Sequence, residues 1–75
     1  MPSRVRPMTA REVEVVQRDH GFELVTQKGS HRKWRHQAQR SQVIVPEHKG
    51  RQLPLGTLMS ILKASEIPES EWRLP

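Results

Sequence analysis

Residues 22–45, FELVTQKGSHRKWRHQAQRSQVIV, contain three short runs in which side chains alternate between two sides of an extended backbone. This period of two, together with the β-branched residues, predicts strands over residues 22–27, 31–36 and 42–45. Gly29 and Ser30 supply a turn between the first two strands, and the polar residues 37–40 form the next hairpin loop. Pro46 ends the third strand.

Helical patterns flank this stretch on both sides. Thr9 and Glu12 have the spacing of a capping box, which predicts a helix over residues 10–20 that ends before Gly21. Its solvent face is expected to carry Arg11, Glu12, Glu14, Gln17 and Arg18. A second helix begins near Gly56 or Thr57 and ends near Ser65. Its core face is an apolar stripe, Leu55, Leu58, Met59, Ile61 and Leu62, and a short final turn is expected over residues 68–72.

The predicted order is α-β-β-β-α, an α+β fold with a three-stranded antiparallel sheet. Three strands cannot shield both faces of a sheet, so both helices are expected on one face and the other face should be open to solvent. A chain of 75 residues is long enough for one domain. We expect a flexible N-terminal lead-in over residues 1–8 and a single domain over residues 9–75.

The two sides of the middle strand differ in character. Trp34 is the only large aromatic residue in the predicted strands besides Phe22, so we expect it to face the helices, with base stacking as the alternative. Alternation then places Arg32 and His36 on the helix side with it. In the first strand, the same reasoning puts Phe22, Leu24 and Thr26 on one side. The open face of the middle strand should carry His31, Lys33 and Arg35.

Positive charge is concentrated in the strand region. The chain has 13 Lys or Arg residues against 8 acidic residues, and seven of the basic ones lie between Lys28 and Arg51, where Glu47 is the only acidic residue. A local basic patch of this kind is typical of a protein that contacts a phosphate backbone. A solvated basic surface without a partner is the alternative.

Composition excludes several classes of protein and site. The chain has no cysteine, so it has neither disulfides nor thiolate metal ligands. The longest apolar run, residues 43–45, is far too short to span a membrane, and the N-terminus lacks the apolar stretch of a signal peptide. We therefore expect a cytoplasmic protein without a membrane partner. The four histidines lack metal-ligand spacing, so neither a metal nor another cofactor is expected.

His31 is the residue in this basic region best suited to chemistry on RNA. An imidazole exchanges protons near neutral pH, and the neighbouring cations can hold a phosphate beside it. RNA carries its own nucleophile, the 2′-hydroxyl, so cleavage needs only proton transfer and charge stabilisation. The pattern is compatible with a ribonuclease that uses His31 as general acid or base. A phosphate contact or an ordinary strand residue is the alternative.

Several motifs in a fixed order resemble the HicA family of toxin mRNA interferases. They are Gly21-Phe22-Glu23-Leu24-Val25, Gln27-Lys28-Gly29-Ser30-His31, Val45-Pro46-x-His48-Lys49-Gly50, Leu53-Pro54-x-Gly56-Thr57-Leu58 and Ile61-Leu62-Lys63. The resemblance covers about residues 9–72. It implies a double-stranded-RNA-binding-like fold, ribosome-independent cleavage of mRNA, and neutralisation by a cognate HicB-like antitoxin. The lack of metal-ligand spacing further predicts that this cleavage needs no metal.

The resemblance also implies roles for individual residues. The family's catalytic histidine closes the Gly-Ser-His motif and corresponds to His31. Apart from the resemblance, the basic patch with its turn and loop predicts the RNA contacts, which are expected to be Lys28, Gly29, Ser30, Arg32, Lys33, Arg35, His48 and Lys49. His48 is either a loop or phosphate contact or a second catalytic group. Two other functions remain open, namely an RNA-binding module without catalysis and an adaptor whose basic patch meets an acidic protein.

Overall fold

The computed structural model describes residues 6–72 and confirms the predicted order of elements. The elements are α1 (Ala10–Asp19), β1 (Phe22–Lys28), β2 (His31–His36), β3 (Gln42–Pro46), α2 (Leu55–Ser65) and a short 3₁₀ helix, η1 (Glu69–Trp72). The first helix ends one residue earlier than predicted, and β1 and β3 each extend one residue further. The predicted final turn is present as η1.

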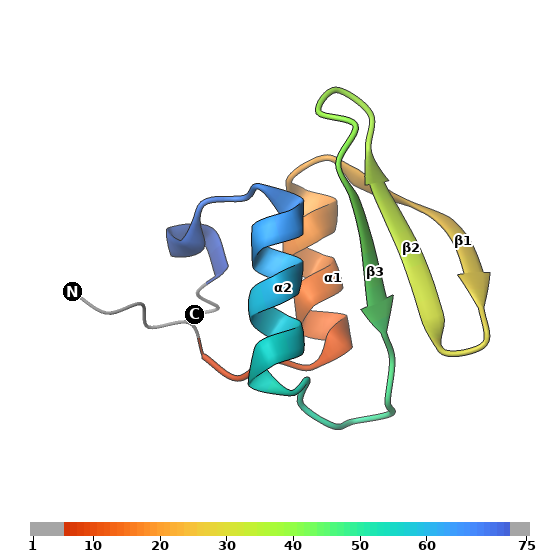
Figure 1. Ribbon diagram of the computed structural model, residues 1–75, viewed down its shortest axis with the longest axis vertical. Coiled ribbons are helices and arrows are strands. Elements are labelled where there is room, and N and C mark those ends of the chain that lie inside the picture. The colour runs from red at the N-terminus through yellow and green to blue at the C-terminus, as the bar shows by residue number, and fades with distance from the viewer. Residues whose placement is uncertain (1–5, 73–75) are drawn as a thin grey trace.

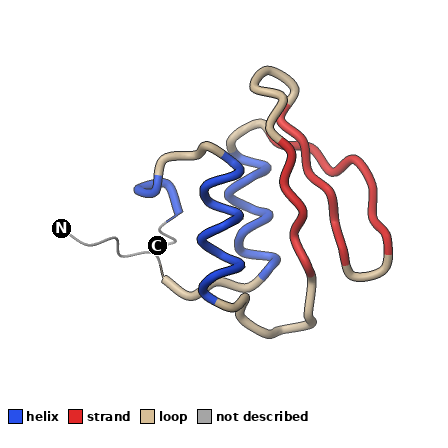
Figure 2. The backbone as a smooth tube through the Cα atoms, in the orientation of Figure 1, coloured by secondary structure: helices blue, strands red, loops and turns tan. Residues whose placement is uncertain are grey.

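The three strands form one antiparallel sheet in the order β1-β2-β3. Both helices lie together on one side of this sheet, and β3 is the strand nearest to them (Figures 1 and 2). The predicted fold class is therefore confirmed. Strand β1 is the outermost element, and Phe22 is the only one of its seven residues that is buried.

The core fills the space between the sheet and the helices. Trp34 is 1% exposed, which confirms that it faces the helices, and the guanidinium of Arg18 lies 5.3 Å from its ring centroid. Met8, which was predicted within the lead-in, is also buried, and its carbonyl accepts a hydrogen bond from the Leu53 amide at 2.8 Å. Residues 1–5 of that lead-in lie outside the described residues. Met8 is thus the first buried residue of the described chain.

Helix α1 begins and ends as its sequence predicts. The Glu12 amide donates to Thr9 Oγ1 at 3.3 Å, and the Thr9 amide donates to Glu12 Oε1 at 2.9 Å, which completes the capping box. Gly21 follows the helix with a φ of +91°. A side chain is strained at this φ, and a Cβ there would lie 2.9 Å from Nε2 of His36. The chain reverses into β1 at this point.

Two polar residues of α1 are not on its solvent face, contrary to the prediction. Glu14 is 6% exposed and Gln17 is fully buried. One carboxylate oxygen of Glu14 accepts a hydrogen bond from Trp34 Nε1 at 2.7 Å and another from Arg32 Nε at 2.6 Å. Glu14 is buried because two donors on the sheet converge on it, and a helical period in the sequence does not reveal such partners.

The predicted alternation along β1 is wrong after Leu24. Leu24 pairs with Trp34, but Thr26 pairs with Lys33, so Val25 forms a β-bulge between them. The extra residue exchanges the two sides of the strand beyond it. Thr26 and Lys28 consequently share the open face with Lys33 and His31, whereas Gln27 pairs with Arg32 on the helix side.

Candidate nucleic-acid interface

His31 opens β2 at the edge of the open face, where the β1–β2 turn ends. It pairs with Lys28 on one side and with Pro46 on the other, and its side chain is exposed. Residues paired across an antiparallel ladder share a face, so the Lys28 ammonium lies on the same side as the His31 imidazole. No hydrogen bond involves the His31 ring within the described part of the chain. The ring is therefore available to a ligand.

Lys33 and Arg35 continue the open face along β2. Trp34 between them is buried against the helices, so alternation turns both side chains to the other face, where they pair with Thr26 and Ile44, and with Glu23 and Gln42. Alternate residues of a strand lie about 6.6 Å apart. Successive phosphates of an extended RNA strand have a comparable separation. The side chains of His31, Lys33 and Arg35, at alternate positions of β2, therefore match the spacing of phosphates along one RNA strand.

Apolar side chains lie on both sides of this row of charged groups. Val25, at the bulge, is 50% exposed, and Ile44 on β3 is 54% exposed. Arg35 also lines a depression of about 360 Å³ with Glu23, Val25, Gln37 and Arg40 at the hairpin end of the sheet. The open face thus combines cations for phosphates with aliphatic surface on which bases can rest.

Arg32 lies on the other side of β2 and is already engaged. Its Nε donates to Glu14 Oε2 at 2.6 Å, its Nη1 donates to Gln27 Oε1 at 3.0 Å, and Nη1 lies 3.9 Å from Glu47 Oε2. The structure therefore separates Arg32 from Lys33 and Arg35. Its contacts bind β2 to α1 and to the segment that follows β3.

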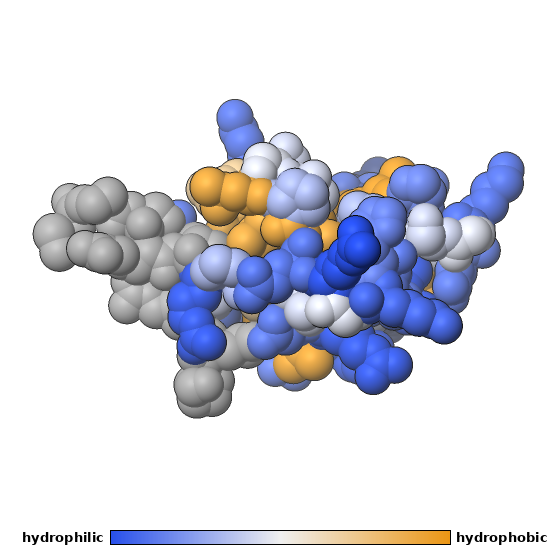
Figure 3. Space-filling model, turned by 90° about the horizontal axis from the view of Figure 1, so that it is seen from below, coloured by the Kyte–Doolittle hydropathy of each residue, from blue (hydrophilic) through white to orange (hydrophobic). Residues whose placement is uncertain are grey.

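The β1–β2 turn lies beside the loop that follows β3. Gly29 has a φ of +60°, which tightens the turn. The Glu47 amide donates to the Ser30 carbonyl at 2.7 Å, so Ser30 and His31 are held against the start of this loop. His48 and Lys49 follow in the loop, and both are exposed. Figure 3 views this end of the molecule from below and shows a largely hydrophilic surface.

The structure gives two of the other histidines structural contacts. His20 donates through Nδ1 to the Val16 carbonyl at 2.9 Å, and its Nε2 lies 3.2 Å from Glu71 Oε1. His36 packs edge-on against Phe22 with ring centroids 5.1 Å apart, and its Nδ1 accepts from the Gln39 amide at 3.1 Å. His31 and His48 are the two whose rings are not held in this way among residues 6–72.

A protein family matches the part of the chain that contains both helices and all three strands. The family described as "HicA toxin of bacterial toxin-antitoxin" matches residues 10–67. The chain belongs to the HicA toxin family. No curated protein matches the chain. The match extends from the first residue of α1 to just beyond α2, and it includes every residue of the predicted RNA-contacting set.

Membership of the HicA family confirms the resemblance in the sequence. It makes the chain a toxin of a toxin–antitoxin system and implies an antitoxin partner. No helix within residues 6–72 has the length and apolar character needed to cross a bilayer. In the same part of the chain, no three His, Asp or Glu side chains converge as metal ligands would.

The structure adds two residues of this HicA toxin that the sequence did not single out as ligand contacts. Arg11 of α1 and Glu47 line a cavity with His48 and Lys49. Arg11 and Glu47 are 36 positions apart in the sequence, and only the packing of α1 against the post-β3 loop brings them together. No local sequence signal points to this cavity.

Proposed function

We propose that this HicA toxin is an endoribonuclease that cleaves mRNA without metal, with His31 as its general acid/base. The observation that carries the proposal is the position of His31. Its imidazole is exposed at the end of the open face, opposite Lys28 and in line with Lys33 and Arg35. These cations can hold successive phosphates while the ring remains free to exchange a proton.

The RNA strand runs along β2 in this proposal. Lys33 and Arg35 contact phosphates that flank the scissile one, and Lys28 faces the scissile phosphate beside His31. The turn residues Gly29 and Ser30 leave room for the backbone to approach, since Gly29 has nothing within 4 Å of the place a Cβ would occupy. Arg32 supports β2 from the helix side and acts as a positioning residue.

The chemistry is an internal transphosphorylation. His31 takes the proton of the 2′-hydroxyl, and the 2′ oxygen forms a bond to the adjacent phosphorus. The bond from phosphorus to the 5′ oxygen then breaks, and that oxygen takes a proton from solvent at this open surface. Lys28 stabilises the negative charge that builds on the phosphoryl oxygens. The products are a 2′,3′-cyclic phosphate and a free 5′-hydroxyl.

A comparison of two histidine variants tests the role of His31. We expect His31→Ala to lower the cleavage rate of an mRNA transcript by about 10²–10⁴-fold, because a general acid or base contributes this much. His20→Gln, at the C-terminal end of α1, should cleave like the wild type. Cleavage by His31→Ala at the wild-type rate would overturn the mechanism. RNA binding without cleavage by the wild type would identify a binding module instead.

The same assay in excess chelator tests the metal-free mechanism. Proton transfer by His31 and charge stabilisation by lysine need no metal ion, so the wild-type rate should be unchanged by the chelator. Loss of cleavage in chelator, with recovery on addition of a divalent cation, would contradict this part of the proposal. Thermal unfolding in chelator serves as the control for an effect on folding.

The proposed partners are mRNA as substrate and a HicB-like antitoxin as inhibitor, with activity in the cytoplasm. An antitoxin that blocks cleavage must cover His31 or the cations that hold RNA near it. Co-expression with the protein encoded by the adjacent gene should restore growth that the toxin alone arrests. A toxin whose growth arrest no such protein relieves would contradict the HicB-like partner.

A further inference from the structure

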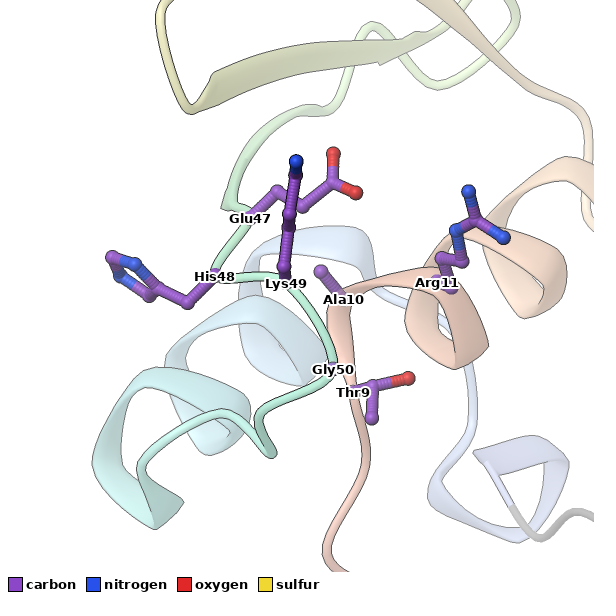
Figure 4. Close-up of a pocket in the computed structure, with 7 residues that line it drawn as sticks. All are labelled: Thr9, Ala10, Arg11, Glu47, His48, Lys49 and Gly50. Carbon is purple, nitrogen blue, oxygen red and sulfur yellow. The ribbon is translucent and has the colours of Figure 1, made fainter.

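A cavity of about 320 Å³ lies between residues 9–11, at the start of α1, and residues 47–50, after β3. It adjoins the proposed catalytic group, because the Glu47 amide donates to the carbonyl of Ser30, the residue before His31. Figure 4 shows both walls of the cavity, one from each segment. The loop that forms one wall of the cavity is therefore hydrogen-bonded to the turn that precedes His31.

The walls of the cavity are fixed by backbone contacts. Thr9 pairs with Gln52 in an isolated antiparallel bridge, and the Leu53 amide donates to the Met8 carbonyl at 2.8 Å. The Arg51 amide donates to the His48 carbonyl at 2.9 Å, which closes a turn within the loop. The cavity is therefore present before any ligand binds.

The side chains of the cavity combine one anion with two cations. In Figure 4 the Glu47 carboxylate, the Lys49 ammonium and the Arg11 guanidinium extend to the same side, while the His48 ring points away. No hydrogen bond or ion pair joins the Arg11 or Lys49 side chain to another group within residues 6–72. Both cations are available to a phosphate.

The Glu47 carboxylate also keeps acceptor capacity. Its one ion pair among the described residues is with Arg32, at 3.9 Å, and Arg32 is held much closer by Glu14, at 2.6 Å. The Glu47 side chain is 28% exposed. A carboxylate that was present only to pair with cations would lie closer to one of them. The carboxylate lines the cavity, and neither of its oxygens accepts a hydrogen bond within residues 6–72.

A ligand that suits these groups has a phosphate at one end and paired hydrogen-bond donors at the other. Among RNA bases, guanine presents two adjacent donors, N1–H and the N2 amino group, on one edge. Adenine and cytosine place an acceptor beside their amino group, and uracil has one N–H between two carbonyls. Two carboxylate oxygens match the guanine edge in the same way as they match an Arg fork.

We propose that this cavity is a guanine subsite of the RNA-binding surface. Glu47 accepts from guanine N1–H and N2–H, and Lys49 and Arg11 contact the phosphate of the same nucleotide. Unpaired bases of single-stranded RNA are commonly read on this edge. The inference rests on the proposed function, since it makes the cavity select the nucleotide that neighbours the cleaved bond.

Binding of single nucleotides tests the subsite without reference to cleavage. The full-length His31→Ala protein is titrated with GMP, AMP, CMP and UMP, and backbone amide shifts are followed by NMR. GMP should shift the amides of residues 9–11 and 47–50 and bind at least tenfold more tightly than the other three. Equal binding of all four, or shifts confined to other residues, would overturn the proposal.

Three further variants separate base recognition from phosphate contact, each made in the His31→Ala background. Glu47→Gln has one acceptor and one donor in place of two acceptors, so it should lose the tenfold preference for GMP. Arg11→Ala should weaken the binding of all four nucleotides to the same extent. Glu71→Gln, a matched change at an exposed position of η1, should leave the preference intact. A preference for GMP that survives Glu47→Gln would overturn the role of the carboxylate.

The outcomes for the subsite and for the proposed function are independent. A wild-type protein that prefers GMP but does not cut RNA would refute the ribonuclease and keep the subsite. A wild-type protein that cuts RNA equally well at all sequences, and binds the four nucleotides alike, would refute only the subsite. The thermal midpoint of each variant shows whether it folds.

Discussion

At the scale of single residues, Glu14 links the buried and functional sides of the fold. Its Oε2 accepts from Trp34 Nε1 and from Arg32 Nε, so one atom ties α1 to two alternate residues of β2. Lys33 lies between these two residues and points to the open face. The orientation of the basic row therefore depends on a carboxylate on the opposite side of the sheet.

Removal of the Glu14 carboxylate should destabilise the protein. Glu14→Ala leaves the buried indole N–H and the partly buried guanidinium without their acceptor, and we expect the free energy of unfolding to fall by about 2 kcal/mol. Chemical denaturation measures this change. Glu23→Ala, at an exposed position of β1, should stay within about 0.5 kcal/mol of the wild type. An equal loss in both variants would contradict the assigned role of Glu14.

Gln17 is a buried residue whose side-chain amide makes no hydrogen bond within residues 6–72. Its side chain is fully buried, and neither amide atom has a hydrogen-bond partner among the described residues. Gln17→Met keeps the length of the side chain and removes the unpaired groups, so stability should rise by about 1 kcal/mol. A denaturation midpoint below that of the wild type would show that the amide is bound by a group such as a buried water.

At the scale of elements, the turn between α1 and β1 depends on a glycine. We expect Gly21→Ala to lower the free energy of unfolding by about 1–3 kcal/mol, because a φ of +91° strains alanine and its Cβ would approach His36. Gly56 in α2 has nothing within 4 Å of a Cβ. Gly56→Ala should therefore raise stability by about 0.5 kcal/mol. Equal effects of the two changes in denaturation curves would contradict this account.

The order of the elements was predictable because each has a local signal. The capping box of Thr9 and Glu12, the alternation around Trp34 and the apolar stripe of α2 each predict one element without tertiary information. The bulge at Val25 has no such signal, because it depends on which residues of β2 face β1. The burial of Glu14 likewise depends on donors that lie 18 and 20 positions further along the chain.

The part of the candidate site that lies on one strand was predictable, and the part that joins distant segments was not. The open-face position of His31, Lys33 and Arg35 follows from the alternation of one strand, and the register confirms it. The same alternation places Arg32 on the helix side of β2. Its ion pair with Glu14 favours a role in positioning β2 over a direct contact with RNA. The cavity formed by Arg11 and Glu47 was not predictable, because it needs two segments that meet only in the folded chain.

At the scale of the whole molecule, positive charge is concentrated on the sheet and the loop beside it, whereas α1 carries charges of both signs. The open face and the adjoining end carry Lys28, Lys33, Arg35 and Lys49, while the acidic residues of η1 lie beyond the helices. Each phosphate contact releases counterions, so log affinity for single-stranded RNA should fall with log salt at a slope of about −0.7 per contact. The open face should therefore dominate the salt dependence of binding.

Alanine variants in the His31→Ala background test this division. Lys33→Ala and Arg35→Ala should each reduce the magnitude of the salt slope by about 0.7. Lys63→Ala, which removes an exposed cation from α2, should leave the slope unchanged. Fluorescence anisotropy of a labelled single-stranded RNA over a salt series measures all three. If Lys63→Ala reduced the salt slope as much as Lys33→Ala or Arg35→Ala, the open face of the sheet would not be the preferred binding surface for RNA.

The burial of both tryptophans has an optical consequence. Trp34 and Trp72 are the only two in the chain, and both are shielded from solvent on the helix side of the sheet. RNA on the open face is separated from the Trp34 indole by the backbone of β2. The emission of the protein should therefore shift to longer wavelength when the chain unfolds and change little when RNA binds. Intrinsic fluorescence can thus follow the stability of the toxin while its nucleic-acid surface is occupied.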